Sequence, residues 1–104
     1  MRTIYVAIGN SDDKLSQADW ADFTKDVTDE VRSVASRIHM AGFSAPIHPW
    51  QNACWVFDVI SLDREQELGA TLAHLALMYD QESIAWAVLG DVTFIKPSPL
   101  PTIA

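Results

Sequence analysis

Hydrophobic and polar positions alternate along residues 2–9, and this two-residue period predicts a β-strand. One face of the strand is wholly apolar and consists of Ile4, Val6 and Ile8. Gly9 and Asn10 follow, and both residue types favour turns, so we expect the strand to end there.

A period of three to four residues replaces this alternation after Leu15 and predicts a helix that ends before Gly42. Ser16 is a suitable N-cap, and Asp19 takes the place of the usual glutamate of a capping box. Leu15 precedes the cap and is positioned to pack on Trp20 as a hydrophobic staple. The apolar stripe of this helix consists of Trp20, Phe23, Val27, Val31, Val34 and Ile38.

The middle of the chain predicts further strands and a second helix. Residues 43–45 predict a short strand and residues 47–52 a connection, because two prolines exclude a central strand there. Residues 53–60 are aromatic and β-branched, which is typical of a strand. Asp63 as N-cap, with Gln66 three positions later, predicts the start of the helix. Its apolar stripe and the residues that widen it are Leu68, Leu72, Leu75, Tyr79, Ala73, Ala76 and Leu77. We therefore expect much of the girth of this helix to be covered.

The C-terminal part of the chain predicts a β-hairpin and a tail. Residues 84–89 and 92–95 are mainly apolar and flank Gly90-Asp91, which is the signal of a type II′ turn. Residues 97–104 are rich in proline and predict an extended tail outside the core. We therefore expect a single α+β domain over residues 1–96, followed by this tail.

This order of elements matches the split β-α-β pattern and predicts a ferredoxin-like two-layer α+β sandwich. Such a fold has an antiparallel sheet with two helices on one face, followed here by the C-terminal hairpin. The face away from the helices, which we call the open face, is normally polar where it meets water. In this chain both faces of the predicted strands are mainly apolar. The aromatic residues that we expect on the open face are Tyr5, Trp55, Phe57 and Trp86.

Three coverings of this open face remain possible at the level of the sequence. The tail or the loop over residues 43–52 folds across it and completes the core. Alternatively, a second copy covers it in a sheet-to-sheet homodimer, since large apolar patches mark interaction sites. The third alternative is a ligand cleft between the sheet and the loop.

The composition restricts the functions that the chain can have. Its formal net charge is −7, and its 7 lysine and arginine residues are scattered, which argues against direct binding to nucleic-acid phosphates. Cys54 is the single cysteine and cannot form an intrachain disulfide, and the first residues lack the apolar run of a signal peptide. Residues 38–57 form the longest stretch without Asp, Glu, Lys or Arg, but its prolines and polar residues do not suit a membrane span. These features together predict a cytoplasmic protein with no membrane contact.

Acidic residues recur on one side of the first predicted helix, and we call this surface the acidic face: Asp19, Asp22, Asp26 and Asp29. An ordinary explanation is that they form the solvated side of an amphipathic helix, with acids in the first turn favouring the helix dipole. The alternative is a surface for a basic protein partner, or one that imitates a row of nucleic-acid phosphates. Like charges at this spacing repel by about 0.2–0.5 kcal/mol per pair, and a helix that keeps them despite this cost favours a functional role. With their acidic neighbours, the candidate partner-binding residues are Asp12, Asp13, Asp19, Asp22, Asp26, Asp29 and Glu30.

The sequence contains no complete catalytic or metal-binding motif. The loop over residues 9–16 lacks the second glycine of a phosphate loop, and its acids repel phosphate. The spacing of His39, His48, His74 and Cys54 fits no zinc signature, and Cys54 has no activating base nearby in the sequence. We therefore expect no cofactor and no metal, and the sequence favours a protein without enzymatic activity.

The segment over residues 50–55 combines two indoles with polar amides at the entrance of a predicted strand. These side chains either satisfy loop backbone groups while burying aromatic surface, or they orient a small ligand. Under the second interpretation, the candidate pocket consists of Trp50, Gln51, Asn52, Cys54, Trp55 and Trp86.

Three segments resemble those of small uncharacterised proteins of actinobacteria and their phages: IGNSDDKL over residues 8–15, WQNACW over 50–55 and SIAW over 83–86. The resemblance implies no specific activity, but it favours a phage or mobile-element accessory protein that binds host machinery. The leading hypothesis is a small acidic, non-enzymatic interaction protein that forms a homodimer and binds a basic host protein through the acidic face. The alternative is a small-molecule-binding protein, or an enzyme that resembles the cofactor-independent monooxygenases built from paired ferredoxin-like units, with a tryptophan-lined pocket.

Overall fold

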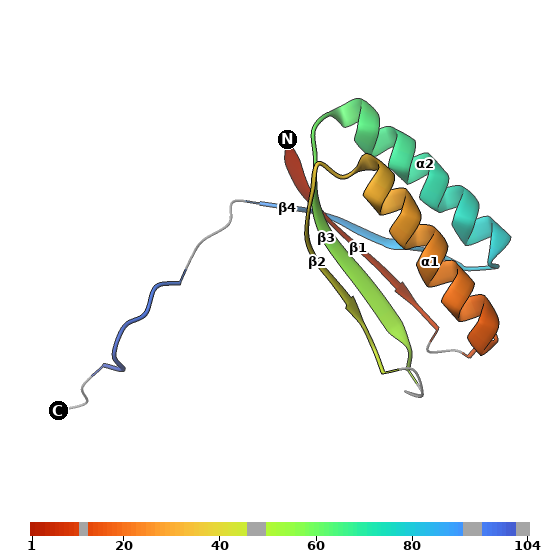
Figure 1. Ribbon diagram of the computed structural model, residues 1–104, viewed down its shortest axis with the longest axis horizontal. Coiled ribbons are helices and arrows are strands. Elements are labelled where there is room, and N and C mark those ends of the chain that lie inside the picture. The colour runs from red at the N-terminus through yellow and green to blue at the C-terminus, as the bar shows by residue number, and fades with distance from the viewer. Residues whose placement is uncertain (11–12, 46–49, 91–94, 102–104) are drawn as a thin grey trace.

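The computed structural model describes residues 1–10, 13–45, 50–90 and 95–101. Its elements follow the order β1 (Arg2–Gly9), α1 (Gln17–Val34), β2 (Arg37–Phe43), β3 (Asn52–Val59), α2 (Leu62–Met78) and β4 (Ala85–Leu89). The described strands form an antiparallel sheet of order β2-β3-β1-β4, and both helices cover the same face of it (Figure 1). This arrangement is the ferredoxin-like two-layer α+β sandwich that the sequence predicts.

The hydrophobic core lies between the sheet and the helices. The helix-facing positions of the two central strands are buried and consist of Ile4, Val6, Ile8, Ala53, Trp55, Phe57 and Val59. The helices contribute the buried residues Trp20, Phe23, Val27, Val31, Leu68, Leu72 and Leu75. The indole N–H of Trp55 donates a hydrogen bond of 3.2 Å to the Thr28 hydroxyl on α1, so the polar atom of this buried ring has a partner.

α1 begins where the sequence predicts and ends earlier. The side-chain oxygen of Ser16 accepts a hydrogen bond of 3.1 Å from the Asp19 backbone N–H, which confirms the predicted N-cap. The helix ends at Val34, so the expected continuation toward Gly42 is wrong. Ile38 lies in β2 and does not extend the apolar stripe of the helix.

The early end of α1 follows from a contact that helical periodicity does not encode. Ala35 adopts an extended conformation directly after the helix. The backbone N–H of Ser36 then donates a hydrogen bond of 2.9 Å to the carbonyl of Asp58 in β3. This bond directs the chain into the sheet, so residues that continue the helical pattern form β2.

The short strand predicted over residues 43–45 is consequently misplaced. β2 ends at Phe43, and the following Ser44 donates its backbone N–H to the Asn52 carbonyl at 2.9 Å. The first three residues of the connection predicted over 47–52 lie outside the described part of the chain. Asn52, the last residue of the predicted connection, already belongs to β3.

The N-cap of α2 is Ser61, and the prediction of Asp63 for this role is wrong. The Ser61 side-chain oxygen accepts a hydrogen bond of 3.3 Å from the Arg64 backbone N–H, and Asp63 lies in the first turn. Leu77 is 78% exposed and Ala73 is also exposed, so the expectation that these residues widen the covered side of α2 is wrong as well. α2 packs beside α1 over the sheet, and the side of α2 that points away from both meets solvent (Figure 1).

β4 is the first strand of the predicted hairpin, whereas the second turn residue and nearly all of the second strand fall outside the described residues, which resume at residue 95. Gly90 itself does not have the positive φ that the first position of a type II′ turn requires. Residues 95–101 are exposed, and in Figure 1 they lead away from the sheet.

Three of the four aromatic residues that we expect on the open face lie on the helix side of the sheet instead. Trp55 and Phe57 are fully buried beneath the helices. Trp86 pairs with Val6 and therefore also faces the helix side. Tyr5 alone of the four lies on the open face. Trp55 and Phe57 are among the largest of the side chains that fill the core between the sheet and the helices.

The two edges of the sheet have different characters. β2, at one edge, carries Arg37 and His39 and has an irregular register between Ile38 and Met40. Charges and bulges hinder the addition of a further strand. β4, at the opposite edge, has the uncharged sequence AWAVL and pairs with β1 in a regular register.

Candidate functional site

The acidic face lies along one side of α1. Asp19, Asp22 and Asp29 are exposed, and Asp26 is half-buried. Asp19 and Asp22 accept no side-chain hydrogen bond from any residue in the described part of the chain, so their charge is directed at solvent. Glu30, which the sequence places at the border of this face, is half-buried.

Tyr79, at the end of α2, lies against the middle of the acidic face. Its hydroxyl donates a hydrogen bond of 2.5 Å to the Asp26 carboxylate, and its ring stacks on Phe23 with centroids 4.8 Å apart. The hydrogen bond to Asp26 is the main cause that raises the pKa of Tyr79 to about 12, and burial and the negative charges of Asp26, Asp22 and Asp19 contribute to the same rise. The sequence gives no sign of this contact, which joins two helices far apart in the chain.

Asp29 also has a partner within the chain. The ammonium group of Lys25 lies 2.8 Å from its carboxylate, one helical turn away. The hydrogen bond to Asp29 is the main cause that raises the pKa of Lys25. The negative charges of Asp29, Asp26 and Asp22 raise this pKa as well. Both side chains are exposed, and such pairs contribute little to stability. Within the described residues, the carboxylates of the acidic face that have no side-chain partner are therefore those of Asp19 and Asp22.

The acidic surface extends beyond α1 to a residue that the sequence analysis missed. Asp80 follows α2, and its carboxylate lies 3.5 Å from the ammonium group of Lys14, which precedes α1. Asp13, the neighbour of Lys14, is exposed, whereas Asp12 lies outside the described residues. No spacing in the sequence connects Asp80 with the start of α1, because only the packing of the helices brings them together.

The residues predicted to form a tryptophan-lined pocket lie in different places. Trp50 and Asn52 are exposed before and at the start of β3. Cys54 alternates with the core residues of β3 and lies on the open face, whereas Trp55 is buried under α1. The structure therefore does not bring these four side chains to one surface.

Gln51 has a structural role at the start of β3. It is buried, and its side-chain oxygen accepts hydrogen bonds from the side-chain amides of Asn10 at 3.1 Å and Gln17 at 3.0 Å. Asn10 is also buried and donates to the Leu15 carbonyl at 3.1 Å. This amide network joins the end of β1 to the start of α1, which is the backbone-satisfying role that the sequence left open.

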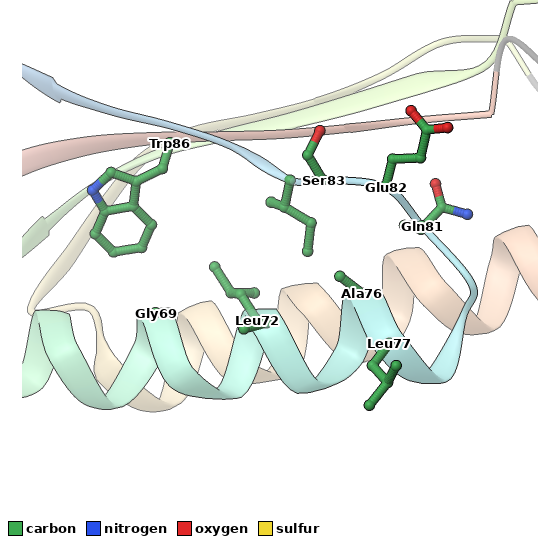
Figure 2. Close-up of a pocket in the computed structure, with 10 residues that line it drawn as sticks. Gly69, Leu72, Ala76, Leu77, Gln81, Glu82, Ser83 and Trp86 are labelled. Atoms are coloured by element: carbon green, nitrogen blue, oxygen red, sulfur yellow. The ribbon is translucent and has the colours of Figure 1, made fainter.

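Trp86 is the member of the predicted pocket that lines a described cavity. This cavity of about 520 Å³ lies between α2 and β4 and is open to solvent. In Figure 2, Trp86 faces α2 near Gly69, and Gln81 lies in the loop at the opposite end. The α2 side is mainly apolar and includes Leu72, Ala76 and the exposed Leu77. The sequence analysis missed the contribution of α2, because it expected these residues to be covered.

A polar cluster occupies one corner of the open face. The hydroxyl of Thr3 donates a hydrogen bond of 2.6 Å to the Asp58 carboxylate, and Nε2 of His39 lies 3.0 Å from the same oxygen. These two contacts, that of Thr3 first, lower the pKa of Asp58. Across the described residues, no three histidine, cysteine or acidic side chains are grouped so that they could hold a metal ion. His74 is exposed on α2, and His48 lies outside the described part.

Neither described helix has the length and apolar character that crossing a membrane requires. Models of known protein families were compared with the chain and none of them matches it. No curated protein sequence matches the chain either, so its function has to be argued from its own residues.

Proposed function

We propose that this protein is a small, non-enzymatic binding module that recognises a basic protein partner through the acidic face of α1. The observation that carries the proposal is the exposure of Asp19 and Asp22 beside the anchored Asp26. Carboxylates on a regular helix keep a fixed spacing, which suits recognition of a row of basic side chains. The lone cysteine and the resemblance to phage-associated proteins favour a host protein of the bacterial cytoplasm as the partner class.

The contact between Tyr79 and Asp26 supports this proposal through rigidity. It joins α2 to α1 at the centre of the acidic face, so the helix that presents the carboxylates is held in place before a partner arrives. Complementary charge mainly accelerates encounter and selects among partners. The net charge of −7 acts in the same direction, because it attracts basic molecules over distances beyond direct contact.

The experiment that tests this proposal compares two variants with the same change of charge. Asp19→Asn with Asp22→Asn removes two charges from the acidic face and leaves Asp26 and its bond to Tyr79 intact. Asp63→Asn with Glu67→Gln removes two charges from exposed positions on α2. The probe is a short lysine-rich peptide whose dissociation constant is measured at several salt concentrations.

We expect the α1 variant to bind this peptide roughly fivefold more weakly and with a smaller dependence on salt, since exposed pairs contribute about 0.5 kcal/mol each. The α2 variant should bind like the unaltered protein. Equal weakening in both variants would show that only the overall charge matters, and this result would refute a site on α1.

A second candidate function rests on the cavity between α2 and β4. Its volume of about 520 Å³ lies within the usual range of small-molecule pockets, and its mainly apolar lining suits an apolar ligand. A panel of apolar metabolites would then raise the melting temperature of the protein. Ala76→Phe fills the cavity and should abolish the rise, whereas a rise that persists in this variant would place the ligand elsewhere.

A further inference from the structure

The open face of the sheet carries two parallel rows of apolar residues. Cross-strand pairing places the residues of the first row opposite one another, and they are Met40, Val56, Tyr5 and Ala87. The second row, two positions along each strand, consists of Gly42, Cys54, Ala7 and Ala85. The first row has mainly large side chains and we call it the ridge. The second has only small side chains and we call it the furrow.

The described part of the chain leaves this face accessible. Both helices lie on the opposite side of the sheet (Figure 1). Met40 is 51% exposed and Tyr5 is half-buried, whereas Ile4, its neighbour on the helix side, is fully buried. Residues 95–101 of the tail are themselves exposed and do not cover the face. An antiparallel sheet face that meets water usually alternates to polar residues, so an apolar one calls for a covering molecule.

The charge distribution indicates what that molecule is. The charged corner of the open face is compensated, since the Asp58 carboxylate contacts Thr3 and His39 and lies opposite Arg37 in the register. The acidic face lies on α1, in the helix layer on the other side of the sheet. Two copies of a chain with a net charge of −7 repel each other least when they meet through the compensated surface with the acidic helices pointing apart.

We propose that the open face binds the open face of a second copy of this chain, around a two-fold axis between the ridge and the furrow. Two residues along a strand span about 7 Å, so this axis brings each ridge over the furrow of the other copy. A symmetric contact requires such a self-complementary surface. Tyr5 and Val56 of one copy then pack over Ala7 and Cys54 of the other. The inference does not depend on the proposed function, and it leaves both acidic faces exposed on opposite sides of the dimer.

The test measures the solution mass of the full chain by light scattering over a wide range of protein concentration. We expect the unaltered protein to reach twice the chain mass of 11.5 kDa. Ala7→Leu fills the furrow with an apolar side chain and should weaken association roughly tenfold or more, because overpacking prevents the ridge from entering. Val56→Lys places like charges in the contact and should give a monomer. Val88→Lys, on the helix side of β4, is the matched control and should leave the dimer intact.

The reactivity of Cys54 gives a second readout that does not depend on mass. In the dimer its thiol is covered and should react slowly with a soluble thiol reagent, and Val56→Lys should accelerate the reaction. Circular dichroism checks that the variants are folded. An unaltered protein that stays monomeric at every concentration would overturn the inference, and so would stronger association in Ala7→Leu, which would indicate unspecific apolar contact.

Discussion

The hydroxyl of Tyr79 donates a hydrogen bond of 2.5 Å to the carboxylate of Asp26, and this bond joins the end of α2 to the middle of α1. It removes one carboxylate of the acidic face from free contact with solvent and holds the other acidic residues on a fixed helix. The same tyrosine stacks on Phe23 of the core. One side chain therefore connects the packing of the two helices with the surface that we propose for partner binding.

The bond between Tyr79 and Asp26 predicts a loss of stability in alkali. The folded protein holds the tyrosine proton up to a pKa of about 12, whereas the unfolded chain releases it near 10. Unfolding therefore releases a proton in this window, so the stabilising contribution is complete below about pH 10 and is lost as the pH rises toward 12. Urea denaturation across this window measures it.

Tyr79→Phe is the control for this prediction. It lacks the hydroxyl, so we expect its free energy of unfolding at neutral pH to be about 1 kcal/mol lower and its decline between pH 10 and 12 to be shallower. A variant that declines as steeply as the unaltered protein would contradict the assignment of the alkaline loss to this residue.

The ion pair between Arg2 and Glu65 predicts a loss of stability in acid. The Arg2 guanidinium holds the buried Glu65 carboxylate through contacts of 3.0 and 2.5 Å, and its hydrogen bond is the main cause that lowers the pKa of Glu65. A lowered folded pKa means that the stabilisation is present above the ordinary value of 4.5 and is lost as the pH falls through the folded value.

Arg2→Met should therefore lower the free energy of unfolding at neutral pH and make its acid dependence weaker. Arg64→Met removes a guanidinium from an exposed pair with Glu67 at 3.3 Å and should have little effect, because solvent screens such pairs. Denaturation at neutral and acidic pH compares the two, and an equal effect in both variants would speak against a special role of Arg2.

Two leucines of α2 should differ in the cost of truncation. Leu68 is fully buried, whereas Leu72 lines the open cavity beside β4. Leu68→Ala leaves a closed void and should lower the free energy of unfolding by about 3–5 kcal/mol, compared with about 2–3 kcal/mol for Leu72→Ala. Urea denaturation of both variants measures the difference, and the opposite order would contradict the description of the cavity.

The N-cap of α2 can be tested against the residue that the sequence favoured. Ser61→Ala removes the side chain that accepts the Arg64 backbone N–H and should cost about 1 kcal/mol. Asp63→Ala removes a charge from the first turn and should cost about 0.3–0.5 kcal/mol, because only its interaction with the helix dipole is lost. A larger cost for Asp63→Ala in thermal denaturation would restore the original assignment.

Local sequence signals predicted those elements whose boundaries are set locally. The Ser16 cap and the strand around Trp55 are examples, since each follows from the residues next to it. The end of α1 is different. No glycine or proline separates Val34 from Ile38, and the chain leaves the helix because Ser36 binds β3, a contact between distant segments. Periodicity alone cannot detect that pairing with β3 replaces the continuation of the helix.

The faces of the strands show the same limit. Both faces of β3 are apolar, so alternation fixes that Trp55 and Val56 point in opposite directions but not which of them meets the helices. The candidate site likewise combines residues that local sequence predicts with residues that only the tertiary packing adds. The acidic face was predictable because it lies within one helix, whereas Tyr79 and Asp80 join it only through the packing of α2 against α1.

The two edges of the sheet differ in how readily they can pair with a strand of another molecule. The border formed by β2 carries Arg37 and His39 and has an irregular register, and these features hinder the addition of a further strand. Within the described residues, the border formed by β4 has neither a charged side chain nor an irregular register, because Ala85–Leu89 is apolar and pairs regularly with β1. Concentrated preparations should therefore begin to aggregate along β4, and a single lysine at Val88 is the simplest way to protect that border.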